Sequence, residues 1–374
     1  MREWLTRDEA LAALKVRPQT LYAYVSRGLI ERRGDAGDPR RSLYRGADVE
    51  GLARRRARGR RTASIAASAL SWGEPVIPTA IATVAHGELI FRGRRAVALA
   101  ERMTLEEVAA LLWGGDDVVT FPVQEADGDP FRSVAALVDG APSMIGRPPA
   151  KLAGEAARCV ATIAAAFGAS GDGPMHLRLA RAWGLEADGA DRVRRALVLL
   201  ADHELNPSTF ATRVAASTGA AMPACILAGL ATLSGPKHGG AGAALAALLA
   251  EAEGAGTPAA IARWTALGHG LPGFGHPLYP HGDPRAGALL ALLMPDAAMA
   301  ALRDGVADAL ELAPNLDFAL LALVRALGLP ANGSLALFAI ARTVGWAAHA
   351  MEQVAAGATI RPRAIYQGPA GGGG

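Results

Sequence analysis

The sequence predicts an almost entirely α-helical protein of more than one domain, with a small basic module at its N-terminus. Its 374 residues are 51% hydrophobic and 20% charged. Such a chain can bury a large core, and it is longer than one domain of usual size. In residues 62–374, Ala/Leu-rich stretches with helical spacing alternate with Gly and Pro, and alternating strand patterns are almost absent. Residues 1–61 carry 16 Lys and Arg against 8 Asp and Glu, a net charge of +8, whereas residues 62–374 carry a net charge of −5.

The N-terminal module has the sequence pattern of a helix-turn-helix followed by a wing. Thr6-Arg7-Asp8-Glu9 matches a capping box at the start of a helix over residues 6–15, and Pro18 is suited to begin a second helix that ends near Gly28. A turn over residues 34–39 separates two basic stretches, which predicts a hairpin, and a basic helix or linker follows over residues 47–61.

Over residues 4–53 the module resembles the winged helix-turn-helix of MerR and excisionase-type DNA-binding proteins. The resemblance implies that the second helix enters a major groove while exposed arginines contact phosphates: Arg32, Arg33, Arg40 and Arg41. The alternative is a docking or dimerisation module whose arginines face solvent. Positive charge favours phosphate contact but specifies no base sequence.

The rest of the chain is expected to contain helices over residues 105–113, 193–205, 241–252, 258–268, 314–327 and 335–353. The uncharged run 214–236 has the length of a membrane span, but Ser, Thr, Gly and Pro interrupt it, so we expect a buried central helix. No secretory signal is visible at the N-terminus. Cys159 and Cys225 lie in Ala/Leu-rich surroundings as small hydrophobes. These features predict a cytoplasmic protein that does not enter a membrane.

Two glycine-rich stretches carry histidines. In Ser234-Gly235-Pro236-Lys237-His238-Gly239-Gly240 the glycines permit close backbone approach to a ligand, although His238 could equally be a structural turn residue. In the second stretch, residues 273–285, His276 follows a glycine-rich turn and Arg285 offers a planar fork for a carboxylate. A metal site there would use His269, His276, His281 and Asp283, but no helical histidine pair or cysteine ligand supports it.

Further ionisable residues stand among apolar ones. Asp317 lies between Leu316 and Phe318 near a helix start, where it is either a proton-accepting carboxylate or a first-turn acid. His203 lies in the polar stretch 201–210, which could be a capped turn. Arg342 lies in an apolar helix and needs an anionic partner, either a bound carboxylate or an internal acid.

Together these stretches resemble the citrate synthase family in order and spacing. The motifs are D-H-E-x-N-x-S-T-F, G-P-x-H-G-G-A, G-F-G-H with D-P-R, N-x-D-F, A-R-T-V-G-W and R-P-R, and residues 87–93 and 104–114 resemble that family's entry segment. The resemblance covers residues 68–368. It implies an all-α, two-domain fold, with a large domain from 62–232 and 333–374 and a small domain from 233–332, preceded by the module and linker 1–61.

The resemblance also implies a mechanism and its residues. Asp317 is expected to remove a methyl proton from acetyl-CoA, His238 to stabilise the enol or enolate, and His276 to activate the ketone of oxaloacetate. The oxaloacetate carboxylates are expected to be held by His203, Arg285, Arg342 and, from the partner subunit of a homodimer, Arg361. Glycines are expected to approach CoA: Gly239, Gly240 and Gly275. Hydrolysis of the citryl thioester then releases CoA, and no metal or permanently bound cofactor is required.

The sequence departs from the family pattern at several positions. Pro277 and Pro280 replace basic residues that commonly lie near the CoA phosphates, Ala319-Leu320-Leu321 follows the D-F motif, and His86 stands where an acid is common. Two alternatives therefore stay open beside citrate synthesis. One is a relative that uses propionyl-CoA to form 2-methylcitrate or cleaves a related acyl-CoA, and the other is a DNA-bound regulator that senses a metabolite.

Overall fold

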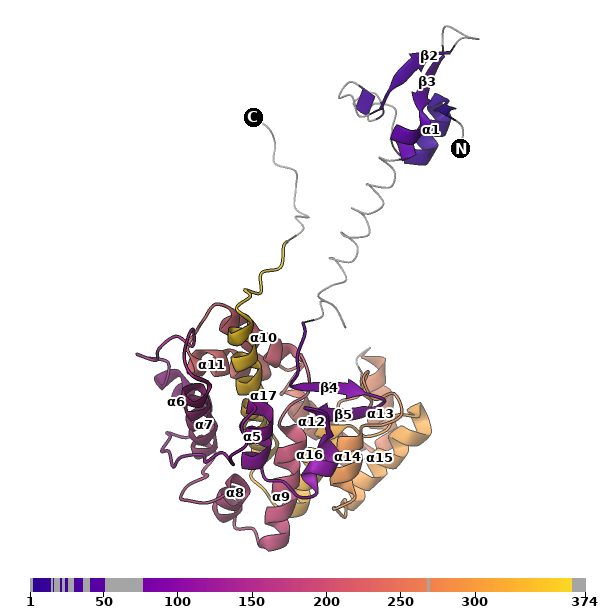
Figure 1. Cartoon of the computed structure of the whole chain (residues 1–374). Coiled ribbons are helices and arrows are strands. Elements are labelled where there is room, and N and C mark those ends of the chain that lie inside the picture. The colour runs from indigo at the N-terminus through magenta and orange to yellow at the C-terminus, as the bar shows by residue number, and fades with distance from the viewer. Residues whose placement is uncertain are drawn as a thin grey trace, which may run out of the picture. The chain divides into compact units, whose positions relative to one another are not determined.

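The computed structural model describes residues 3–14, 16, 21, 24–25, 30–35, 41–50, 77–267 and 270–364. Contacts within the chain define two compact units, one formed by Met1–Pro78 with Pro362–Gly374 and the other by Thr79–Arg361 (Figure 1). The division of the body at residues 232 and 332 stays a prediction.

The N-terminal unit contains a small antiparallel sheet and a helix. Its described elements are β1 (Trp4–Leu5), α1 (Arg7–Leu14), β2 (Arg32–Gly34) and β3 (Ser42–Arg45), with strand order β1-β3-β2. The capping box is confirmed, because the Glu9 carboxylate accepts a hydrogen bond from the Thr6 amide at 2.8 Å. The β2–β3 pairing confirms the hairpin. Most of the expected second helix, Arg40 and residues 51–61 lie outside the described residues.

The larger unit is mainly helical, which confirms the predicted fold class. Its elements are β4 (Ala82–Ala85), β5 (Glu88–Phe91), β6 (Arg94–Arg95), α4 (Ala96–Ala100), α5 (Leu105–Trp113), α6 (Pro130–Ala136), α7 (Pro149–Ala166), α8 (Met175–Trp183), α9 (Ala187–Leu200), α10 (Pro207–Ser217), α11 (Met222–Leu233), α12 (Ala241–Ala255), α13 (Thr257–Ala266), α14 (Pro284–Leu290), α15 (Ala297–Leu310), α16 (Leu316–Leu327) and α17 (Gly333–Ala356).

A three-stranded antiparallel sheet, β4-β5-β6, was not expected from the sequence. Its strands have at most four residues, too few for a clear alternating pattern. His86 and Gly87 join β4 to β5, both with left-handed backbone, φ 52° and 74°. Two consecutive residues with this backbone form the tight turn that suits the twist of a hairpin. His86, which departs from the family pattern, is therefore the first residue of this turn.

The expectation of one helix over 214–236 was wrong. Helix α10 ends at Ser217, Gly219 has a left-handed φ of 78°, and α11 begins at Met222 with Pro223 in its first turn. A left-handed glycine ends a helix, and proline fits the start of the next. Among the described residues, no helix is both long enough and apolar enough to cross a membrane.

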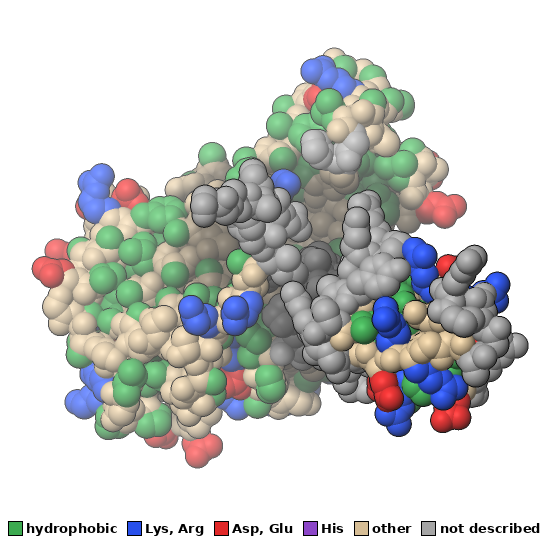
Figure 2. Space-filling model, turned by 90° about the horizontal axis from the view of Figure 1, so that it is seen from above, with side chains coloured by type: hydrophobic (Ala, Val, Ile, Leu, Met, Phe, Trp, Pro, Cys, Tyr) green, Lys and Arg blue, Asp and Glu red, His purple; other side chains and the backbone are tan. Residues whose placement is uncertain are grey.

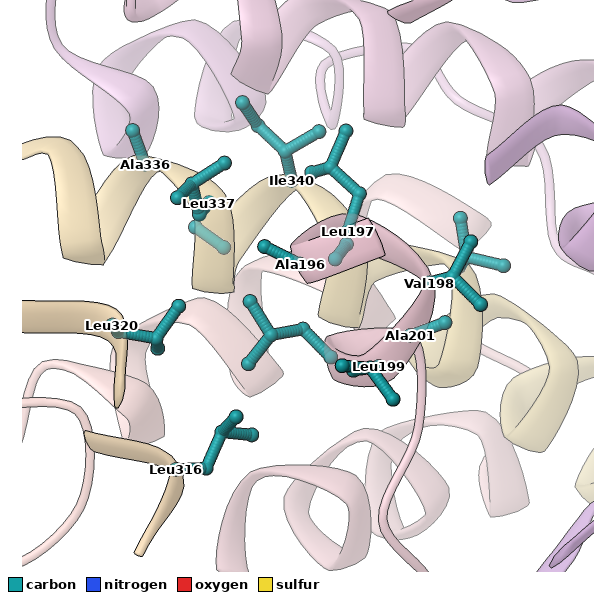
Figure 3. Close-up of a cluster of buried hydrophobic side chains, with 14 of the residues drawn as sticks. Ala196, Leu197, Val198, Leu199, Ala201, Leu316, Leu320, Ala336, Leu337 and Ile340 are labelled. Atoms are coloured by element: carbon teal, nitrogen blue, oxygen red, sulfur yellow. The ribbon is translucent and has the colours of Figure 1, made fainter. Parts of the chain in front are cut away.

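Helix α17 is the central helix of the larger unit. It contacts α5, α7, α9, α10, α11 and α16 and is buried along most of its 24 residues. Figure 3 shows side chains of α9, α16 and α17 meeting in this core, among them Leu197, Leu320 and Leu337. Because three of the segments that carry predicted site residues pack together here, the core fixes their relative positions.

Both cysteines are free and buried in this unit, as expected. Burial raises the pKa of Cys159 and of Cys225 to about 12, so neither is a reactive thiolate at neutral pH. On the left part of the face in Figure 2, charged side chains of both signs lie singly or in small groups among hydrophobic and uncharged ones.

Candidate active site

The predicted site residues converge from five segments of the larger unit. His203 follows α9, His238 precedes α12, His276 lies before α14, Asp317 is in the first turn of α16, and Arg342 is in α17. Arg285 joins them from the first turn of α14. Ring contacts, hydrogen bonds and electrostatic interactions link these groups. Arg361 is exposed after α17, and no described hydrogen bond or ion pair joins it to this cluster.

His203 and His276 form an aromatic group with Tyr279. The two histidine rings meet edge to face with centroids 5.1 Å apart, and the Tyr279 hydroxyl is hydrogen-bonded to His203 Nε2 at 2.9 Å. Burial, reinforced by the Arg285 charge, lowers the pKa of both histidines, so both rings are neutral at pH 7. His276 Nδ1 accepts a hydrogen bond from the Leu278 amide at 3.1 Å. Its proton therefore lies on Nε2, and the ring can donate to a ligand oxygen.

His238 is held by a serine on α10. Its Nε2 lies 2.8 Å from Ser208 Oγ, which also bonds to the Asn206 side chain at 2.7 Å and accepts from Trp346 Nε1 at 3.2 Å. Burial lowers the pKa of His238 to about 4, so the ring is neutral. The Ser208 proton has two acceptors, Asn206 and His238. When it goes to His238, the ring carries its own proton on Nδ1 and can donate it to a bound carbonyl.

The two buried arginines have different partners. Arg285 makes two hydrogen bonds to the Asp283 carboxylate, at 2.9 and 2.7 Å, so an internal acid already faces it. Arg342, only 2% exposed, donates from Nε to the Leu200 carbonyl at 2.9 Å, and its guanidinium lies 4.6 Å from the Phe338 ring centre. No ion pair within 4 Å is found for Arg342 among the described residues. Burial lowers its pKa to about 10, which leaves it charged and suited to an added anion.

Asp317 is placed by its helix start. The Asn315 side chain caps α16 by accepting from the Asp317 amide at 3.0 Å. Burial raises the pKa of Asp317 to about 6, against the opposing effect of the Arg285 and Arg342 charges. A carboxyl group with this pKa is ionised at pH 7 and still basic enough to accept a proton, as a general base requires.

The backbone of the chain itself requires glycine at the three positions predicted to contact CoA. A Cβ on Gly239 would lie 2.5 Å from the Leu233 carbonyl oxygen, and one on Gly240 would lie 2.7 Å from Pro236 Cα. Gly275 has a left-handed φ of 67°. Each position therefore needs glycine for the shape of its loop, whether or not a ligand approaches.

A cavity of about 330 Å³ opens beside His276. Residues 311–314 form one side, and the 275–283 loop forms the other, with Pro277 and Pro280 among the lining residues. The two prolines that depart from the family pattern thus line the same cavity as His276, one of the predicted catalytic residues.

Within the described part of the chain, no group of three or more His, Cys, Asp and Glu could hold a metal. His276 and Asp283 are engaged with Leu278 and Arg285 instead. His269, which the metal alternative also required, lies outside the described residues.

Three polar residues of the site were not singled out from the sequence, Asp202, Ser208 and Tyr279, and Asp283 was considered only as a metal ligand. Asp202, Ser208 and Asp283 lie inside the motifs that carried the family resemblance, and Tyr279 lies between the G-F-G-H and D-P-R motifs. Their partners are distant in sequence; Ser208 and His238, for example, are 30 residues apart. The motifs marked these segments, but only the fold shows which atoms meet.

The fold and the cluster define a helical protein in which two buried arginines, the partly buried Asp317 carboxyl group and three neutral histidines lie together. The family model for the citrate synthase C-terminal domain matches residues 150–363, more than half of the chain. The chain belongs to the citrate synthase family.

Curated relatives agree with this membership. The chain is 36% identical over 187 residues to a putative citrate synthase 2 of Mycobacterium tuberculosis, which covers 46% of this chain and 50% of the relative. It is 36% identical over 186 residues to citrate synthase 2 of Bacillus subtilis, covering 47% of this chain and 50% of that protein. The chain thus spans about half the length of the curated relatives it matches.

Solved structures share the fold. A citrate synthase from Thermotoga maritima superimposes with a TM-score of 0.68 at 24% identity, covering 79% of this chain and 94% of that one. A citrate synthase from Thermoplasma acidophilum, solved as a ternary complex with carboxymethyl coenzyme A and oxaloacetate, gives a TM-score of 0.65 at 24% identity, covering 79% and 94%. The larger unit therefore has the helical citrate synthase fold.

Proposed function

We propose that this chain is a citrate synthase, which joins the methyl carbon of acetyl-CoA to the ketone carbon of oxaloacetate and hydrolyses the product thioester to citrate and CoA. The observation that carries the proposal is the buried Arg342, without an ion-pair partner among the described residues, in one cluster with Asp317 and three neutral histidines. A related protein has been solved with oxaloacetate and a CoA analogue together.

Each group has a distinct part in the proposed reaction. Asp317 accepts a proton from the methyl group, and His238 Nδ1–H stabilises the resulting enol or enolate oxygen. The new carbon–carbon bond forms while His276 Nε2–H stabilises the developing alkoxide by a hydrogen bond, and this oxygen then takes up a proton from solvent to become the hydroxyl group of the product. Water then cleaves the thioester, which releases CoA and leaves a carboxylate. This assignment needs no metal and no permanently bound cofactor.

The substrate carboxylates are assigned to His203, Arg342 and the outer N–H groups of Arg285. Arg285 is already bonded to Asp283 through Nε and one terminal nitrogen, so a substrate meets its remaining donors. Arg361 is exposed, and no described hydrogen bond or ion pair joins it to the cluster of its own chain. We assign it to the site of a second copy in a homodimer that acts in the cytoplasm.

The first test measures release of free CoA thiol by the purified protein with oxaloacetate, comparing acetyl-CoA and propionyl-CoA. Faster turnover with acetyl-CoA is expected, since the curated relatives described above carry the name citrate synthase. Preference for propionyl-CoA would contradict the proposed acyl donor, and no release with either would contradict the reaction. Asp317→Ala should abolish turnover and keep oxaloacetate binding.

The N-terminal unit supports a second, separate function, which is binding to duplex DNA. Its β2–β3 hairpin exposes Arg32 and Arg33, and Arg41 is exposed just before β3. Arg33 lies over the Trp4 ring at 3.9 Å, which orders one of these cations. Full-length protein should bind duplex DNA with an affinity that falls steeply as salt rises, and the double change Arg32→Glu, Arg33→Glu should weaken binding. Equal binding by this variant would exclude the hairpin as the contact.

A further inference from the structure

A buried polar chain lies behind the site, and none of its members has a part in the proposed reaction. It runs from Glu352 through Arg213 and His349 to Asp202, the residue before His203. Arg213, His349 and Asp202 are each at most 1% exposed. Burying so many polar groups is unfavourable unless each is well bonded, so the arrangement needs an explanation.

Arg213 fixes the orientation of His349. Its Nε donates to His349 Nδ1 at 2.9 Å, and its terminal nitrogens bond to Gln353, Thr79 and Glu352. An arginine N–H can only donate, so His349 Nδ1 must be the acceptor. The neutral ring then carries its proton on Nε2, which faces the Asp202 carboxylate at 3.4 Å.

One face of helix α17 contacts the three consecutive residues 200–202, at the end of α9 and directly before His203. Arg342 bonds to the Leu200 carbonyl at 2.9 Å, the Gly345 amide to the Ala201 carbonyl at 3.0 Å, and His349 to the Asp202 side chain. Spacings of three and four residues place these positions on one helix face. The closeness depends on Gly345, because a Cβ there would lie 2.4 Å from the Ala201 oxygen and from Asp202 Oδ1.

His203 stands in a turn that is held on both sides. On one side, Asp202 bonds to His349 and accepts from the Glu204 amide at 3.1 Å. On the other side, Glu204 has a left-handed φ of 51°, and its carboxylate accepts from the Val84 amide at 2.5 Å. The position of the His203 ring therefore depends on the Asp202 contact to α17.

Asp202 also acts on Arg342 electrostatically. Its charge favours the charged form of the Arg342 guanidinium, and no ion pair between the two is within 4 Å. If Asp202 turned toward Arg342, it would occupy the donors that a substrate carboxylate needs. The His349 bond holds it back.

We propose that His349 and Asp202 are positioning residues for the carboxylate-binding half of the site. They hold His203 in place and support the charge of Arg342 while leaving its outer N–H groups open. The inference rests on the proposed function for the identity of the ligand, oxaloacetate.

The test compares His349→Leu with His349→Gln. Glutamine can accept from Arg213 and donate to Asp202, whereas leucine can do neither. For His349→Leu we expect the oxaloacetate KM to rise at least about tenfold while the acetyl-CoA KM changes less than about twofold, and we expect His349→Gln to recover most of the loss. Equal effects on both KM values, or no recovery with glutamine, would overturn the proposal.

A control at another buried polar side chain is Arg178→Met, because the hydrogen bonds of Arg178 among the described residues go to the carbonyls of Phe121 and Pro122, outside the cluster. It should lower Tm and leave both KM values unchanged. Stabilisation of each variant by oxaloacetate, read from Tm, gives a second measure that needs no turnover. Wild-type protein that binds oxaloacetate without releasing thiol would refute the proposed reaction alone, and an unchanged oxaloacetate response in His349→Leu would refute the positioning role alone.

Discussion

The partly buried carboxyl group of Asp317 links stability to the proposed activity, and Asp317→Asn separates the two. The pKa of this group is raised from 3.8 to about 6, chiefly by burial. One pKa unit corresponds to about 1.4 kcal/mol, so the ionised form destabilises the folded protein by up to about 3 kcal/mol above pH 6. Asparagine mimics the neutral carboxyl at every pH. We therefore expect Asp317→Asn to be the more stable protein at pH 8.

The size of this effect depends on pH. The folded-state pKa is the higher one, so the destabilisation is complete above about pH 6 and disappears as the pH falls toward 3.8. The Tm advantage of Asp317→Asn should be several degrees at pH 8 and should vanish near pH 4. Thermal unfolding across this range gives the stability, and thiol release with acetyl-CoA and oxaloacetate gives the activity.

Two results would refute the reasoning. Turnover near that of wild type would exclude Asp317 as the base, and a Tm at pH 8 equal to or below wild type would exclude burial as the cause of its raised pKa. Loss of turnover together with a gain in stability is the expected pair of results.

Three further predictions address pH, charge and packing. The acid limb of the kcat/KM profile should have its midpoint near pH 6, from Asp317, with no added loss from His238 above pH 5, because the pKa of that ring is about 4. Arg342→Leu should raise the oxaloacetate KM by about 30-fold or more in steady-state assays, and an unchanged value would mean that an internal acid is its partner. Gly345→Ala should cost about 1–3 kcal/mol in unfolding experiments and lower kcat/KM, since its Cβ would lie 2.4 Å from Asp202 and Ala201. Gly254→Ala, with open space around its Cβ, should do neither.

Helical periodicity and terminal signals predicted much of the fold. The helix over residues 105–113 has the expected bounds, and Thr104 forms a capping box there. The helix expected over 193–205 is instead Ala187–Leu200, which puts His203 in a turn. The polar residues after Leu200 are held by distant groups, Tyr279 and α17, so no local pattern could show where the helix stops.

The site was predictable in its residue types but not in its connections. Motif order placed His203, His238, His276 and Asp317 in one site, and the structure brings their side chains into one cluster. A family resemblance can group them because it carries three-dimensional information. It did not show that Arg285 is already paired with Asp283, since an arginine two residues from an acid has many possible arrangements. Pairings between segments depend on how the helices pack, and only the folded chain determines them.

The contacts of Asp283 limit which substitutions this site can accept during evolution. Its carboxylate bonds twice to Arg285, caps the start of α14 and accepts from the Leu316 amide at 3.2 Å, directly before Asp317. One side chain thus joins Arg285, the proposed substrate-binding arginine, to the segment that carries Asp317, the proposed base. Effects of substitutions at these positions should not add. A variant that adapts the site to a different ligand must keep this connection or replace all its members together, which restricts the evolutionary routes open to this protein.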